Sequence, residues 1–109
     1  MATHTFLVIS NAVPGREAEF NRWYTEQHLS DVLKVPGFVA ARRFEVAQDP
    51  HGLPGRYVAI YEMDTEDPAA TLAALETAAT SGDMVMTDTL DMDTVSATLL
   101  RAITDRITR

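Results

Sequence analysis

The sequence contains no cysteine, and this absence excludes whole classes of chemistry. Among 109 residues there is no thiol to form a disulfide or to act as a nucleophile, and no metal site can be built on cysteine ligands. Basic residues are also scarce, with 9 Lys and Arg against 16 Asp and Glu and a formal net charge of −7. Nucleic acids and anionic membrane surfaces are bound by clustered Lys and Arg, so we expect neither as a partner.

Long apolar runs are missing too. No segment approaches the roughly 18 consecutive apolar residues of a membrane-spanning helix. The first residues do not show the basic and apolar regions of a secretory signal, so we expect a cytoplasmic protein. The length is that of one domain, which we place at residues 1–109. A chain this short buries only roughly 60–70% of its unfolded surface, and a homodimer would relieve that shortage.

Sequence motifs for the common cofactors are absent. There is no GxGxxG, P-loop, HExxH or GxSxG pattern, so we predict no nucleotide, flavin or nicotinamide cofactor. An acidic, Met-containing segment at 83–93 lacks the glycine and terminal glutamate of an EF-hand loop, so we predict no metal there and assign the segment no structure.

What the sequence does contain is an alternation of strand-like and helix-like segments. Apolar and β-branched runs predict strands at 6–9, 38–46, 56–63 and 95–103. Helices are predicted at 16–29 and 69–80, with a second helical turn at 32–35 capped by Ser30 and Asp31. Turn-forming residues at 49–55 join the second and third strands. This βαββαβ order predicts an α+β, ferredoxin-like fold, with an antiparallel four-stranded sheet and two helices on one face.

The second predicted strand has two distinguishable faces. Strict alternation places Arg43 on one face with Val39, Ala41 and Glu45, and places Phe38 on the opposite face.

The first helix carries a stripe that is both aromatic and polar. On a helical wheel His28 lies at the margin of a group formed by Phe20, Trp23, Tyr24, Gln27 and Asp31. The ordinary pKa of histidine, near 6.5, suits acid/base chemistry at neutral pH. We predict His28 as the catalytic base, with Asp31 orienting its ring and Tyr24 stabilising an oxyanion. The alternative is that His28 ends the helix and hydrogen-bonds the following loop.

Further residues are candidates for substrate binding. Trp23 and Phe20 either line an aromatic pocket or belong to the core, and Gln27 needs a partner if it is buried. Tyr61 and Asn11 are candidate cleft residues. His4 and His51 are expected at the surface.

Arg43 has two interpretations. Its guanidinium is suited to a bidentate contact with a substrate carboxylate. The alternative is an ion pair with Glu45, with Glu62 or with an acid of a partner chain.

One stretch resembles a known family. A W-Y-x-E-x-H-L run at 23–29 leads into a P-G-F turn at 36–38 and then into a strand that holds Arg42 and Arg43. This pattern resembles the EthD-like branch of the dimeric α+β barrel superfamily, and Tyr57–Met63 resembles the family's third strand. The resemblance implies a homodimer in which two sheets pack face to face, with a cleft between the helices and the sheet of each subunit.

The resemblance also sets the functional hypotheses. The superfamily includes muconolactone isomerases, polyketide cyclases and cofactor-free monooxygenases. We expect a cofactor-independent enzyme that acts on a small hydrophobic, oxygenated (aromatic, polyketide or lactone-like) metabolite by His-mediated acid/base chemistry of the isomerase, cyclase or lyase type. The alternatives are a non-catalytic dimer that binds a small ligand or assists a pathway, and a cofactor-free or haem-using monooxygenase.

Overall fold

The computed structural model describes residues 3–48 and 52–109, and its elements follow the predicted order. They are β1 (His4–Ser10), α1 (Glu17–Trp23), the π-helical turn η1 (Tyr24–His28), α2 (Leu29–Leu33), β2 (Phe38–Glu45), β3 (Tyr57–Met63), α3 (Pro68–Ser81), the short 3₁₀ turn η2 (Met92–Thr94) and β4 (Ser96–Arg101). Part of the predicted turn at 49–55, including His51, lies outside the described residues. None of the helices in the described part is long and apolar enough to cross a membrane.

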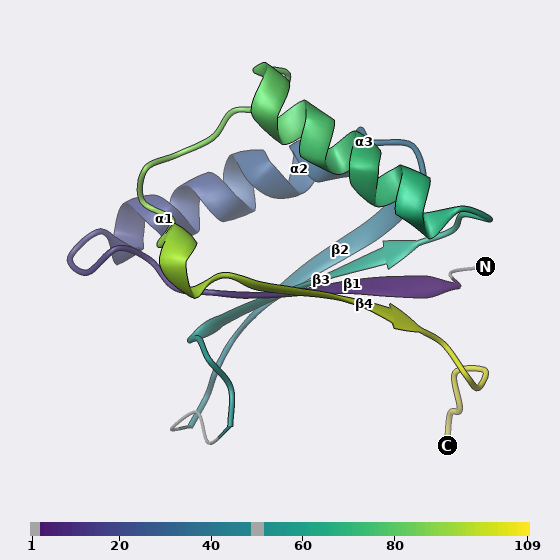
Figure 1. The fold of residues 1–109 in the computed structure, drawn as a ribbon. Helices are drawn as coiled ribbons and strands as arrows, with labels where there is room; N and C mark the ends of the chain where they lie inside the picture. Colours follow the sequence, from purple (N-terminus) through teal and green to yellow (C-terminus); the bar gives the residue numbers. More distant parts are fainter. Residues whose placement is uncertain (1–2, 49–51) are drawn as a thin grey trace.

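The four strands form one antiparallel sheet in the order β2-β3-β1-β4. The continuous α1–η1–α2 helix and α3 lie together over one face of this sheet (Figure 1). The predicted ferredoxin-like fold is therefore confirmed. The segment after β4 and the described ends of the connection between β2 and β3, residues 46–48 and 52–56, project from the opposite side of the sheet (Figure 1).

The first helix runs without interruption from Glu17 to Leu33. The predicted cap at Ser30 and Asp31 is therefore wrong, because these residues lie inside the helix. The helix changes its winding instead: in η1 the backbone N–H of Leu29 donates to the carbonyl oxygen of Tyr24, five residues earlier. A π-helical turn of this kind inserts one extra residue into an α-helix.

Strand β2 contains a β-bulge that changes its facing pattern. Phe38 pairs with Met63, but Ala40 pairs with Glu62, so the register shifts by one residue between them. Phe38 is buried on the helix-covered face, with its ring 6.0 Å from that of Tyr61. The prediction that Phe38 faces away from Arg43 is therefore wrong, because the extra residue of the bulge reverses the alternation.

The first turns of helix α3 are capped by a side chain and packed against the turn before β2. Asp67 caps the helix by accepting from the Ala70 N–H at 3.1 Å. Thr71 is buried against Gly37, where a Cβ would lie 2.7 Å from the Thr71 hydroxyl oxygen. The helix ends at Gly82 in the left-handed conformation. The start of α3 is thus tied to the turn before β2.

No helix of the described residues covers the second face of the sheet (Figure 1). By the strand register, this face includes Leu7 and Ile9 of β1 and Val58 and Ile60 of β3. An antiparallel sheet that is apolar on both faces needs a second covering layer.

Candidate functional site

The π-helical turn brings three aromatic rings into contact. The rings of Trp23 and His28 are stacked, with centroids 4.5 Å apart and an angle of 25° between their planes. The ring of Tyr24 meets the His28 ring edge-on at 4.9 Å. Residues five apart in an ordinary α-helix point about 140° away from each other. The wider turn is what allows Trp23 and His28 to stack.

His28 has unused hydrogen-bonding capacity. Within the described residues its Nδ1 atom is buried and has no hydrogen-bond partner. Burial lowers the pKa of His28 to about 4, the nearby Asp31 opposes this shift, and Arg43 adds to it. His28 is therefore neutral at pH 7. Within residues 3–48 and 52–109 it makes no hydrogen bond to the following loop.

Asp31 does not orient the His28 ring as predicted. Its Oδ2 accepts from Gln27 Nε2 at 2.8 Å and from the Val85 N–H at 3.3 Å, and its Oδ1 lies 3.4 Å from Lys34 Nζ. These bonds, led by the one from Gln27, lower the pKa of Asp31, while burial opposes them. No hydrogen bond joins Asp31 to His28 in the described residues, because the carboxylate is used to hold the chain near Val85.

A covering segment, residues 83–91, packs beside these groups; we call it the strap. Trp23 donates its indole N–H to the Val85 carbonyl oxygen at 2.9 Å. Because Asp31 accepts from the N–H of the same residue, both backbone polar groups of Val85 are bound by side chains of the first helix. The strap is thus held by Trp23 and Asp31, and Gln27 supports this attachment by binding Asp31. The positions of these residues in the sequence did not reveal this structural role.

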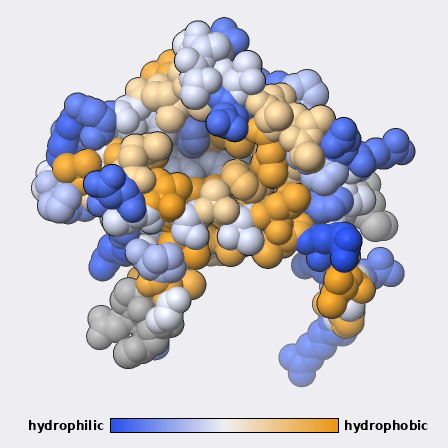
Figure 2. Space-filling view, viewed as in Figure 1, coloured by the Kyte–Doolittle hydropathy of each residue, from blue (hydrophilic) through white to orange (hydrophobic). Residues whose placement is uncertain are grey.

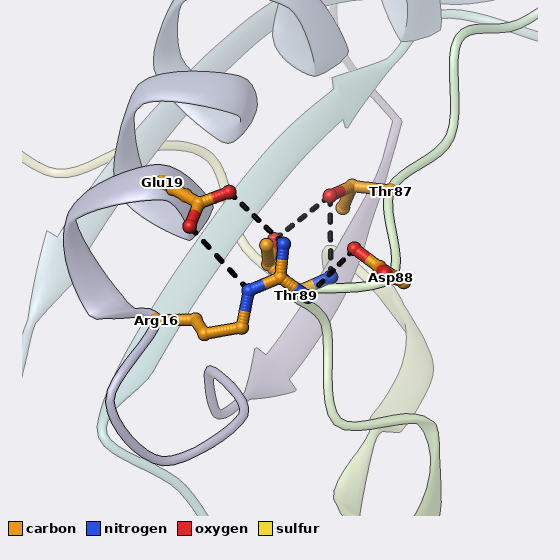
Figure 3. Close-up of polar contacts among 5 residues, drawn as sticks. All are labelled: Arg16, Glu19, Thr87, Asp88 and Thr89. Carbon is orange, nitrogen blue, oxygen red and sulfur yellow. Dashed lines mark hydrogen bonds and ion pairs between the residues drawn. The ribbon is translucent and has the colours of Figure 1, made fainter.

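The other end of the strap is attached near the start of α1 (Figure 3). Arg16 bridges Glu19 at 2.9 Å and Asp88 at 2.8 Å, and the hydroxyl groups of Thr87 and Thr89 lie 2.9 Å apart. These ion pairs are substantially exposed, so they add little stability. Thr89 is buried, with 1% of its surface exposed, and it anchors this end more firmly.

Tyr24, which contacts His28, is itself contacted by Tyr61 and Arg43. The Tyr61 hydroxyl donates to the Tyr24 hydroxyl oxygen at 2.9 Å, and both residues are buried. Burial raises the pKa of both phenols, so both are neutral. The Arg43 guanidinium carbon lies 4.6 Å from the centre of the Tyr24 ring, a cation–π contact.

Arg43 does not form the ion pair expected within the chain. It donates to Thr25 Oγ1 and Asn21 Oδ1, each at 2.8 Å, and to the Asn21 carbonyl oxygen at 3.3 Å. Among the described residues no ion pair links it to Glu45 or Glu62. Asn21 and Thr25 were missed as functional candidates; their spacing of four residues on a helix that packs near an arginine-bearing strand was the available signal.

Two predicted binding residues make structural contacts and have no contact with His28 among the described residues. Phe20 has no exposed surface and packs on the Tyr24 ring at 5.6 Å, so it belongs to the core. Asn11 donates to the Pro54 carbonyl and to Thr94 Oγ1 and accepts from the Arg56 N–H. Asn11 therefore joins β1 to the beginning of β3 and does not adjoin His28.

A hollow opens between α3 and the sheet (Figure 2). The elements beside this space carry apolar residues that pack on the core but are only partly buried: Phe6 and Val8 in β1, Leu72 and Leu75 in α3, and Leu90 in the strap. Leu99 of β4, opposite Phe6 in the register, is 38% exposed. The α1–η1–α2 helix lies behind this opening in the same view (Figures 1 and 2). The hollow thus has a largely apolar rim (Figure 2) and lies on the helix-covered side of the sheet, which also holds His28, Tyr24 and Tyr61.

Comparison with known proteins gives matches in structure but not in sequence. No known family model and no curated protein matches the sequence. An EthD family protein from Bacillus halodurans matches with a TM-score of 0.52 and 11% identity, over 93% of this chain and 99% of the other. Another neighbour is described as a dimeric ferredoxin-like protein. The chain has the fold of the dimeric α+β barrel proteins.

Two further proteins with this fold were solved with ligands. The haem degrader MhuD from Mycobacterium tuberculosis, with two haems in its active site, matches with a TM-score of 0.64 and 13% identity, over 94% and 98% of the two chains. A monooxygenase from Streptomyces coelicolor, in complex with nanaomycin D, matches with a TM-score of 0.57 and 14% identity, over 99% and 94%. At these identities the likeness is one of fold, and function has to be argued from the site.

Proposed function

We propose that this protein is a cofactor-independent enzyme that binds a small, largely apolar, oxygenated metabolite between α3 and the sheet and transfers a proton at His28. The observation that carries the proposal is the buried, unpartnered Nδ1 of His28. An unsatisfied buried polar atom costs free energy and persists where function requires it. The neutral ring has a lone pair that can accept a proton.

The environment of His28 determines how such a step proceeds. Burial holds its pKa near 4, so a free imidazolium is unfavourable in this site. A proton taken from an enol, a phenol or a carbon beside a carbonyl leaves an anion next to the new imidazolium, and the two charges stabilise each other in a poorly solvated space. Tyr24 stands next to His28 and is the candidate to stabilise the oxyanion.

The same first step serves two reaction types. If the anion rearranges, the enzyme is an isomerase, cyclase or lyase. If the anion reacts with oxygen, it is a cofactor-free monooxygenase, the second candidate, which the monooxygenase among its structural neighbours supports. Oxygen consumption during turnover separates the two: the first type uses no oxygen, whereas a monooxygenase uses one molecule for each molecule of substrate.

The haem-using alternative makes His28 an iron ligand instead of a proton acceptor, and the haem degrader among the structural neighbours is the reason to test it. Adding haem to the purified protein tests this alternative, because a Soret band that shifts on binding and disappears in His28→Gln would favour it over the cofactor-independent reaction.

Solvent deuterium exchange tests proton transfer without knowledge of the natural substrate. We expect the wild-type protein to accelerate exchange at the acidic carbon of a panel of cyclic 1,3-diketones and hydroxynaphthoquinones, followed by NMR. His28→Gln should slow the exchange about 10²–10⁴-fold, the contribution of one positioned acid or base. His4→Gln, the same change at the start of β1, is the matched control and should have no effect.

The non-catalytic alternative gives a different result in this experiment. A ligand-binding or accessory protein would bind members of the panel without accelerating exchange, and His28→Gln would leave the affinity unchanged. That pair of outcomes would refute proton transfer at His28.

We also propose that the chain is a homodimer formed through the helix-free face of the sheet. Leu7, Val58 and Ile60 share that face by their register, and burying an apolar sheet face against a second copy is a common solution for a small domain. Light scattering should show a dimer, and Ile60→Arg should give a monomer. Met92→Arg, at a 69% exposed position on η2, should remain dimeric; a monomeric wild type would refute the proposal.

A further inference from the structure

Arg43 is a half-buried cation without a neutralising partner. In the described part of the chain, no carboxylate lies within ion-pair distance of its guanidinium. Glu45, on the same strand, pairs with Arg56 at 3.4 Å. Asp31, on the helix, is bound by Gln27, Lys34 and the Val85 N–H. The nearby acids thus form their close contacts elsewhere, and Glu45 acts on Arg43 only as a nearby charge, without an ion pair.

The surroundings of Arg43 are aromatic. Its guanidinium carbon lies 4.6 Å from the ring centre of Tyr24, 5.6 Å from that of Phe20 and 5.7 Å from that of Tyr57. Tyr24 in turn meets the ring of His28 at 4.9 Å. A charge beside buried rings is screened much less than a charge in water, so its field reaches the far side of Tyr24.

Arg43 is also fixed in place. Nη1 donates two hydrogen bonds and Nη2 donates one, to Asn21 and Thr25, and these bonds hold the guanidinium beside the Tyr24 ring. Leaving this position to grip a ligand would break three bonds and the stacking contact. The residue is therefore built to act from where it stands.

We propose that Arg43 is a positioning residue that makes the hollow selective for a ligand with an anionic oxygen, acting across the Tyr24 ring without touching the ligand. This inference rests on the proposed function, because it takes the hollow as the ligand site. It adds that the ligand is negatively charged. The ligand class is an aromatic or polyketide-like molecule that carries a carboxylate, a phenolate or an enolate. In a chain whose formal net charge is −7, such a ligand needs a local source of positive potential.

The protein's own titratable groups already experience this field. Arg43 adds to the lowering of the His28 pKa and opposes the rise in the pKa values of Tyr24 and Tyr61 that burial causes. Each of these effects favours negative over positive charge near His28. An anionic ligand would benefit in the same way.

A pair of ligands of equal shape tests the proposal. Calorimetry compares 2-naphthoate, an anion, with 2-naphthamide, its neutral isostere, for the wild type and for Arg43→Gln, Arg43→Lys and Arg22→Gln. Arg22→Gln removes the same charge from an exposed position on α1. We expect the wild type to bind the anion at least about tenfold more tightly, as expected for unit charges less than about 10 Å apart in a partly buried site.

The variants separate charge from packing. Arg43→Gln should reduce the preference for naphthoate to less than about threefold, while Arg22→Gln should keep it. Arg43→Lys keeps the positive charge but loses the planar guanidinium, and it should keep most of the preference for naphthoate. This result would show that the weaker preference of Arg43→Gln comes from the lost charge and not from poor folding, and thermal melts check the folding of each variant. Equal binding of both ligands by the wild type, or an undiminished preference in Arg43→Gln, overturns the role of Arg43 but leaves the hollow as a ligand site. If neither ligand binds the wild type, the apolar ligand site of the proposed function is refuted as well.

Discussion

At the scale of single residues, the candidate site depends on a short row of aromatic rings in which each ring restricts the movement of the next. Trp23 stacks on His28 and also binds the strap, so the His28 ring cannot tilt without disturbing Val85. Tyr24 stands between His28 and Arg43. A ligand that approaches His28 therefore meets a neutral imidazole whose position is already fixed, which lowers the entropic cost of a proton transfer.

The tyrosine pair gives a prediction about coupling. Tyr61 donates to Tyr24, and neither hydroxyl has another hydrogen bond within the described residues. Each single change to Phe therefore leaves the other hydroxyl buried without a partner and should lower the free energy of unfolding by about 1–3 kcal/mol. Urea denaturation measures both variants. The double variant should cost less than the sum of the two, and additive costs would show that the bond between the hydroxyls does not stabilise the fold.

Residue patterns predicted part of this site. Tyr24 was predicted to act beside His28, and the two rings do meet, because i, i+4 neighbours remain close in the wider turn. The same argument failed for Asp31, since a carboxylate within reach of a histidine was also within reach of Gln27 and of a backbone N–H from the distant strap. The spacing of residues along one helix does not reveal which hydrogen-bonding groups from distant parts of the chain also reach the carboxylate.

At the scale of elements, the fold was predictable where local signals agree with tertiary packing. The helix predicted at 69–80 is α3, Pro68–Ser81, and its bounds differ from the prediction by one residue at each end. The π-helical turn η1 and the bulge in β2 were not predicted. Each inserts one extra residue into a regular element, which costs stability. The turn gains the stacking of Trp23 on His28, and the bulge gains the burial of Phe38. Both gains come from tertiary packing, which the spacing of apolar residues in the sequence does not reveal.

The attachment of α3 gives a prediction at this scale. Gly37 has a φ of +106°, and a Cβ there would lie 2.7 Å from the Thr71 hydroxyl oxygen. Gly82 has a φ of +90° and nothing within 4 Å of its added Cβ. Gly82→Ala should therefore cost only backbone strain, about 1–2 kcal/mol, while Gly37→Ala should cost at least about 1 kcal/mol more because of overpacking.

Thr71→Ala provides the check on that interpretation. In its background the added methyl group of Gly37→Ala meets less side chain, so the cost of the glycine substitution should fall toward that of Gly82→Ala. Chemical denaturation of the single and double variants measures this coupling. An unchanged cost would show that the strain at Gly37 comes from the backbone and not from the approach of α3.

At the scale of the whole molecule, burying a neutral histidine ties the stability of the fold to pH. His28 has a pKa of about 4 in the folded protein, against 6.5 for an ordinary histidine. As the pH falls below about 6.5, the unfolded chain binds a proton at this position and the folded chain does not, so stability decreases. The decrease continues until the folded protein is also protonated near pH 4, and it totals roughly 3 kcal/mol.

Between pH 6.5 and pH 5 the effect of His28 on stability can be measured separately from that of Asp31. The pKa of Asp31 is lowered in the folded protein, so its contribution to stability begins to decrease only at lower pH. In that window the free energy of unfolding of the wild type should fall by about 2 kcal/mol, measured by urea denaturation at fixed ionic strength. His28→Gln has no titrating group at this position and should show a much flatter profile, whatever its stability at pH 7. Parallel profiles for the two proteins would mean that His28 keeps an ordinary pKa in the folded state, and would remove the buried neutral imidazole from which proton transfer at this site was argued.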